Sequence, residues 1–222
     1  MHYSSVMGEV PGLRERKKLR TRQALITEAL RLFLEKGYEQ TTVSEIAMAA
    51  EVSTRTFFSY FASKEEVLLH HVRESLDRAL RTVAERRSDD SPADLLARVV
   101  ATAFEATMGS AEMRRDSASI TQLMMTVPSL RAYGLLLLFD TQRELAEALH
   151  QACPEELDLI EASAAVGGVI GAVKLAGFIC LRRGGSPDEV AEASRRAAEI
   201  AIAGMRAVGK GETPGDPALG NR

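Results

Sequence analysis

The sequence predicts an all-α protein of about nine helices, and three observations carry this prediction. Ala, Leu, Glu and Arg dominate the 222 residues, whereas aromatic residues make up only 5%. Capping residues and prolines recur at intervals typical of helix starts. No stretch alternates apolar and polar residues as a strand would. With 45% hydrophobic residues, the chain can form one large or two small domains with a real core.

Four helices are predicted in the first part of the chain. The first covers 13–36 and ends at Gly37. Its inner stripe has helical spacing and consists of Ile26, Ala29, Leu30 and Phe33. The second, 43–50, starts after a capping box in which Thr42 and Glu45 each satisfy an orphan backbone N–H. The third, 53–60, is capped by Ser53, and a second capping box at 63–66 opens a long fourth helix to about residue 87.

Five further helices are predicted beyond residue 90, at 91–108, 112–126, 128–151, 154–183 and 186–208. Three of them begin with a proline at the first helical position, which needs no hydrogen-bond donor. A fourth proline, Pro154, is expected to start the helix that ends near residue 183. The two ends, 1–12 and 209–222, are rich in Gly, Pro and polar residues, and we expect them to be disordered.

The two short helices joined by a tight turn predict a helix-turn-helix, the unit that places its second helix in the major groove of DNA. Phe57 and Phe61 lie one turn apart and are expected to point inward with Val52. Four residues then face outward on the second helix: Thr54, Arg55, Thr56 and Ser59. Hydroxyls and a guanidinium can read base edges and phosphates. A plain three-helix bundle with a solvated face is the alternative.

The net charge of −3 hides an asymmetry along the chain. Through Lys64 there are ten basic and seven acidic residues, and the remainder carries a net charge of −6. Six basic residues form an arm near the start of the first helix, ahead of the helix-turn-helix: Arg14, Arg16, Lys17, Lys18, Arg20 and Arg22. Such a run usually forms a solvated face, but beside a reading head it is suited to the DNA backbone or minor groove.

The segment TTVSEIAMAAEVSTRTFFSYFASKEEVLL, residues 41–69, strongly resembles the TetR family of transcriptional regulators. The resemblance extends over Arg14–Leu69, since a basic first helix ending in Phe-x-x-Lys-Gly-Tyr precedes this segment. It implies a DNA-binding domain over 13–62 and a helical ligand-binding and dimerisation domain over 63–208. The residues implied to bind DNA are Thr42, Ser53, Thr54, Arg55, Thr56, Phe58, Ser59, Tyr60, Lys64, Arg20 and Arg22.

Within this set the resemblance implies separate roles. Residues 54–56 would face base edges, with Arg55 matching guanine O6 and N7 through its planar fork. Thr42 at a helix N-terminus, and Tyr60 and Lys64, would hold phosphates. Phe58 stands where many family members have Tyr, so its contact must be apolar, to a sugar or a thymine methyl. Glu51 stands where the turn often has Gly, and a left-handed conformation there would cost roughly 1–2 kcal/mol.

The resemblance further implies a homodimer held by the last two helices, and hence a palindromic operator. The small-residue run 164–172 supports close helix approach, because each Gly within a helix costs about 1 kcal/mol relative to Ala. Packing inside one subunit is the alternative. The residues expected at the dimer interface are Gly167, Gly168, Gly171, Val190 and Ala197.

The family implies a small effector, here lipophilic, that binds among the middle helices and releases DNA; repression is the default role. The candidate effector residues are Phe104, Met108, Leu123, Met124, Tyr133, Phe139, Arg143 and Phe178. A stripe of Met, Leu and Phe is more often simple core, which is the alternative for most of this set. The sequence does not identify the effector.

Other classes of protein find little support in the sequence. It contains no phosphate-binding loop, no Gly-x-Ser-x-Gly, no HExxH and no His or Cys cluster with metal spacing, so we expect neither an enzyme nor a bound cofactor or metal. A helical carrier with a vestigial DNA head remains an alternative. The sequence shows no apolar run of about twenty residues and no secretory signal, which predicts a cytoplasmic protein without a membrane span. Cys153 and Cys180 are expected to be buried free thiols.

Overall fold

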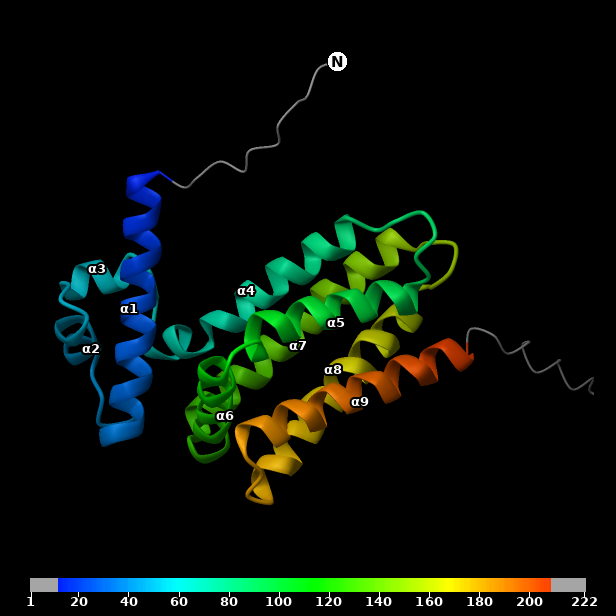
Figure 1. Ribbon diagram of the computed structural model, residues 1–222. Helices are drawn as coiled ribbons and strands as arrows, with labels where there is room; N and C mark the ends of the chain where they lie inside the picture. Colours follow the sequence, from blue (N-terminus) through cyan, green and yellow to red (C-terminus); the bar gives the residue numbers. More distant parts are fainter. Residues whose placement is uncertain (1–11, 209–222) are drawn as a thin grey trace, which may run out of the picture. The chain divides into compact units, whose positions relative to one another are not determined.

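The computed structural model describes residues 12–208 and confirms the all-α prediction, with nine helices and no strand among these residues (Figure 1). Both predicted disordered ends, apart from Gly12, lie outside the described residues. The helices are α1 (Leu13–Lys36), α2 (Val43–Ala49), α3 (Thr54–Phe58), α4 (Lys64–Ala84), α5 (Pro92–Met108), α6 (Ala111–Thr126), α7 (Pro128–Ala152), α8 (Leu159–Arg182) and α9 (Pro187–Val208).

Most helix starts lie where capping residues predicted them. Ser91 accepts a hydrogen bond from the Asp94 N–H and precedes Pro92 at the first position of α5. The prediction for α8 is wrong: Pro154 lies in a turn and does not begin the helix. The cap is Asp158, which forms a capping box with Glu161, so the local hydrogen bonds of an acidic cap outweigh the preference of proline for a first turn.

The described chain divides into two compact units, residues 12–70 and 71–208, and the division falls inside α4. The sequence predicts this boundary earlier, after residue 62. The first unit holds α1, α2, α3 and the first turns of α4. Its core contains Leu25, Ala29, Leu30, Phe33, Ile46, Phe57 and Phe61. Ile26, expected in the inner stripe of α1, is only half-buried, and Leu25 takes the buried position.

The second unit packs α5 to α9 and the rest of α4 around one apolar core. That core includes Val83, Leu95, Leu96, Val99, Leu145, Leu149, Val166, Val169 and Ile202. Helices α8 and α9 form an antiparallel hairpin (Figure 1). At Gly177 the two helices come so close that an added Cβ would lie 2.7 Å from Ser194 Oγ. A side chain at position 177 would therefore force Ser194 to move within the contact between α8 and α9.

Candidate nucleic-acid interface

The predicted capping box at the start of α2 is present. Thr42 Oγ1 accepts the Glu45 N–H at 3.2 Å, and a Glu45 carboxylate oxygen accepts the Thr42 N–H at 2.9 Å. The same carboxylate accepts bonds from the Thr42 hydroxyl at 2.7 Å and from the Lys36 ammonium at the end of α1. The bond from Lys36, followed by those from Thr42, lowers the pKa of Glu45 to about 2. Glu45 thus fixes the start of α2 to the end of α1.

The turn between α2 and α3 has the hydrogen bonds of a Schellman motif. The Val52 N–H donates to the Ala47 carbonyl at 2.9 Å, and the Glu51 N–H donates to the Met48 carbonyl at 3.1 Å. This geometry requires a left-handed residue after the helix, and Glu51 has a φ of 56°. The condition set out from the sequence is therefore met: Glu51 is left-handed, and it is the only non-glycine residue with positive φ among residues 12–208.

Helix α3 is short and is held by its two ends. Ser53 Oγ accepts the Thr56 N–H at 3.0 Å and shares a hydrogen bond with the Thr56 hydroxyl at 2.9 Å. Phe57 and Phe61 are fully buried, with ring centroids 5.9 Å apart, and anchor the inner side of the helix. Thr54, Arg55, Phe58 and Ser59 are exposed, and Thr56 is half-buried. The hydroxyl and guanidinium groups predicted to read DNA therefore lie on the outer side of α3.

Sequence reasoning missed a contact between α4 and the loop after α1. Lys64 Nζ donates to the Tyr38 carbonyl at 2.9 Å and the Thr41 carbonyl at 3.4 Å, and it lies 4.1 Å from the Tyr38 ring centroid. The buried Tyr38 hydroxyl donates to Glu65. Burial, reinforced by the neighbouring Glu65, raises the pKa of Tyr38. Tyr38 and Lys64 both lie in the part of the sequence that resembles the TetR family. Nothing in the sequence indicates that the two residues are in contact.

These contacts bear on the residues predicted to hold phosphates. Thr42 is exposed, but both its N–H and its hydroxyl already bind Glu45. Lys64 is half-buried, and its ammonium is directed to backbone carbonyls. Tyr60 is half-buried beside Phe61, with ring centroids 6.5 Å apart. Phosphate binding by these three residues stays a prediction.

The six basic residues before the helix-turn-helix lie on the first turns of α1. All are exposed except Arg22, which is half-buried and has a buried Nε without a hydrogen-bond partner. The basic run is thus a helical surface within the described residues.

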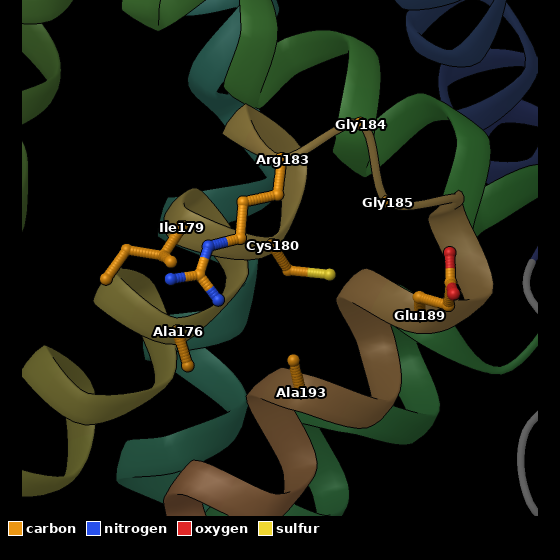
Figure 2. A pocket seen from close by; sticks show the side chains of 8 residues that line it. All are labelled: Ala176, Ile179, Cys180, Arg183, Gly184, Gly185, Glu189 and Ala193. Carbon is orange, nitrogen blue, oxygen red and sulfur yellow. The ribbon is translucent and has the colours of Figure 1, made fainter.

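The residues predicted to bind an effector do not line the cavity found between α8 and α9. That cavity, about 550 Å³, lies between the C-terminal end of α8 and the start of α9 (Figure 2). Its walls are Ala176, Ile179, Cys180, Arg183, Gly184, Gly185, Glu189 and Ala193. Cys180 is half-buried there rather than buried as expected, whereas Cys153 is buried.

The predicted effector residues differ widely in exposure. Leu123 is buried, and five others are half-buried: Phe104, Met108, Met124, Tyr133 and Phe178. Phe139 is 68% exposed on α7. Arg143 is also exposed and pairs with Glu147 on its own helix at 2.8 Å. Within the described unit, Phe139 and Arg143 therefore face outward and do not form part of an enclosed site.

The predicted dimer residues divide in a similar way. Val190, predicted at the dimer interface, is buried against Gly177 inside its own unit, so its side chain is already covered there. Ala197 and Gly167 are half-buried, and Gly168 and Gly171 are exposed. A Cβ added at any of these three glycines would meet no atom within 4 Å, apart from the backbone of α8. Packing inside the subunit therefore does not explain them.

Helix α8 departs from the expectation of no membrane-length apolar run. Among the described residues, Leu159–Arg182 is long and apolar enough to cross a membrane, judged by length and composition. Helices α6 and α7 would meet the same criteria only together, as one sharply bent span. The run is inconspicuous in the sequence because Gly and Ala supply much of its apolar character. Its exposed stripe contains Ile160, Ala164, Gly168, Gly171, Leu175 and Ile179.

Comparison with known proteins identifies the first unit. A family model described as "Bacterial regulatory proteins, tetR family" matches residues 25–70. The chain is 48% identical over 130 residues to the HTH-type transcriptional regulator TcmR of Streptomyces glaucescens. That alignment covers 57% of this chain and 55% of TcmR, so the match spans about half of each protein.

Solved structures share the fold over a larger part of the chain. A TetR-family regulator from Syntrophomonas wolfei has a TM-score of 0.59 at 16% identity, covering 90% of this chain and 100% of its own. Thermus thermophilus FadR, described as a TetR-family repressor in complex with lauroyl-CoA, has a TM-score of 0.51 at 22% identity with the same coverage. At these identities the likeness concerns the fold alone. Over residues 25–70, in its N-terminal unit, the chain thus matches the TetR family of bacterial regulatory proteins.

Proposed function

We propose that the protein is a sequence-specific DNA-binding repressor that inserts α3 into the major groove. The observation that carries this proposal is the two-sided character of α3. Phe57 and Phe61 fix its inner side in the core, while Thr54, Arg55 and Ser59 remain exposed on its outer side. A helix held in this way presents its polar side chains as one rigid unit, and the major groove is wide enough to admit it.

Arg55 is the residue we assign to base recognition. It is exposed, no ion pair or hydrogen bond holds its guanidinium within the described residues, and its planar fork matches the two acceptors of guanine. Arg20 is exposed on α1 and would contact a phosphate. Phosphate contacts position the protein without reading sequence.

A homodimer formed through α8 and α9 completes the proposal. The exposed stripe of α8 is apolar and includes Ile160, which is 77% exposed. Gly168 and Gly171 leave open space that nothing in the same unit fills. Glycines within a helix lower its stability, and close approach of a partner helix would offset that cost. Two-fold symmetry then requires a palindromic operator.

An effector would release the repressor from DNA by binding its two conformations with different affinity. The FadR complex with lauroyl-CoA supports a lipophilic effector of the acyl-thioester class. Exposed apolar side chains on α7, such as Phe139, could become part of a pocket only in a conformation or assembly other than the free subunit.

Selection from a pool of random duplexes tests the proposal directly, since it requires no candidate operator. The full-length protein is expected to enrich a two-fold symmetric sequence, and fluorescence anisotropy should then show two chains, or a multiple of two, per duplex. Affinity should fall steeply with salt concentration because counterions are released. Absence of any enriched sequence would overturn the proposal.

Two arginine variants separate reading from positioning. Arg55→Ala should lose discrimination at one base pair of each half-site, by about 1–3 kcal/mol. Arg20→Ala should weaken binding to all sequences alike. It should also reduce the slope of log affinity against log salt concentration by about one, the value for one phosphate contact. If Arg55→Ala weakened every sequence equally, Arg55 would be a phosphate contact. Lauroyl-CoA, with free coenzyme A as control, is the first probe for release of the selected duplex.

A further inference from the structure

Phe58 is an exposed aromatic residue on the outer side of α3. Its side chain is 58% exposed, although its neighbours Phe57 and Phe61 are fully buried. The Phe57 and Phe58 rings form an edge-to-face pair with centroids 5.4 Å apart and an interplanar angle of 83°. The buried ring therefore supports the exposed one and limits its freedom.

Phe58 shares its side of α3 with two of the exposed polar residues. Thr54 precedes it by four positions and Arg55 by three, and residues at these spacings are neighbours on a helix surface. An aromatic ring, a hydroxyl and a guanidinium thus form one small surface, all of it exposed.

The phenyl ring has no polar atom, so it cannot donate to a phosphate or to a base acceptor. Burying it against a polar base edge would leave that edge without its hydrogen bonds to water, which is unfavourable. In the major groove the one apolar group among the base edges is the C5 methyl of thymine. That methyl is the chemical partner that suits the ring.

We propose that Phe58 recognises a thymine C5 methyl in each half-site, and so contributes to sequence specificity. This inference rests on the proposed function of α3 as the reading helix. Arg55 and Phe58 are three residues apart, about 4.5 Å along the helix axis, and base pairs are about 3.4 Å apart. The thymine should therefore lie within about two base pairs of the guanine contacted by Arg55.

Replacement of thymine by deoxyuridine tests this directly, since it removes only the C5 methyl and keeps the base pair. Each thymine of one half-site of the selected duplex is replaced in turn, and affinity is measured by anisotropy with the full-length protein. One replacement is expected to weaken wild-type binding about fourfold, the value of one buried methyl group. With Phe58→Ala, the same replacement should have no further effect.

Matched variants control for other causes. Met48→Ala removes an exposed apolar side chain from α2 and should leave the fourfold deoxyuridine effect intact, as should Arg55→Ala. Phe58→Leu, which keeps an apolar side chain, should retain part of the effect. Phe58→Ala loses the edge-to-face contact with Phe57 and should lower the unfolding midpoint slightly, so circular dichroism at the assay temperature is used to show that the variant is folded.

The outcomes are distinguishable. If no thymine is sensitive, or if the sensitive thymine is equally sensitive with Phe58→Ala and Phe58→Leu, the methyl contact is refuted while specific DNA binding stands. In that case a loss of affinity with Phe58→Ala that is independent of base identity would assign the ring to the sugar-phosphate backbone. If wild-type protein selects no sequence at all, it is the proposed function that fails.

Discussion

The ammonium group of Lys64 and the ring of Tyr38 lie 4.1 Å apart, and Lys64 Nζ also donates to the Tyr38 carbonyl at 2.9 Å. Lys64→Met keeps the aliphatic chain but removes these contacts. The Thr41 carbonyl then loses its donor, whereas the Tyr38 carbonyl still accepts the Thr41 N–H at 3.3 Å. We expect the free energy of unfolding to fall by about 1–3 kcal/mol. Urea denaturation followed by far-UV circular dichroism measures this change.

Arg55→Met is the matched control, because it also replaces a cation in the first unit but at an exposed position. It should leave the unfolding midpoint unchanged. If Lys64→Met were as stable as wild type and only weakened DNA binding, the role of Lys64 as a phosphate contact would be the correct one.

Glu51 occupies the left-handed position of the turn, with a φ of 56°, and Glu51→Gly should stabilise the protein. Removing Cβ relieves roughly 1–2 kcal/mol of strain, and the greater freedom of glycine in the unfolded chain offsets part of it. The net gain should be about 0.5–1 kcal/mol by urea denaturation. Glu51→Ala retains Cβ and should give none of this gain; an equal gain with alanine would mean that the carboxylate, not the backbone, is the cause.

Glu45 makes stability dependent on pH in the acid range. The pKa of its carboxyl group is lowered to about 2 in the folded protein by bonds from Lys36 and Thr42, against an ordinary value of 4.5. A lowered pKa means that the contribution is fully present above pH 4.5 and is lost as pH falls toward 2. Glu45→Gln should therefore be less stable than wild type at pH 7, and the difference should narrow below pH 4.5. Paired denaturation curves from neutral pH down to about pH 2.5 measure this, and a constant difference would contradict it.

The predictions that succeeded depend on local hydrogen bonds. Thr42 with Glu45, and Ser91 with Pro92, set helix starts through groups three residues apart or fewer, which a sequence displays directly. Pro154 misled because proline permits a helix start without requiring one, and the capping box of Asp158 decided the boundary. The left-handed conformation of Glu51 was raised from the sequence only as a condition, and the local hydrogen bonds of the turn decide it.

Sequence reasoning missed contacts between distant residues. Nothing in the sequence pairs Tyr38 with Lys64, which are 26 positions apart, or indicates that Val190 is buried against Gly177. Likewise, apolar residues on a helix look alike whether they line a pocket, fill a core or, as Phe139 does, remain exposed. Periodicity identifies a helix face but not what covers it.

The glycines of α8 allow the proposed dimer to be tested separately from folding. Gly171 has open space beside it, so Gly171→Leu fits the free subunit and even improves helix propensity by about 1 kcal/mol. We expect sedimentation velocity to show a dimer for wild type and a monomer for Gly171→Leu, with a circular dichroism spectrum that is still helical.

Gly177→Leu is the contrasting variant, because its Cβ would lie 2.7 Å from Ser194 Oγ and strain the contact between α8 and α9 inside the unit. It should lower the unfolding midpoint. A Gly171→Leu protein that remained dimeric would show that the partner packs elsewhere, since no dimer with helices in close contact at Gly171 could accommodate the leucine side chain.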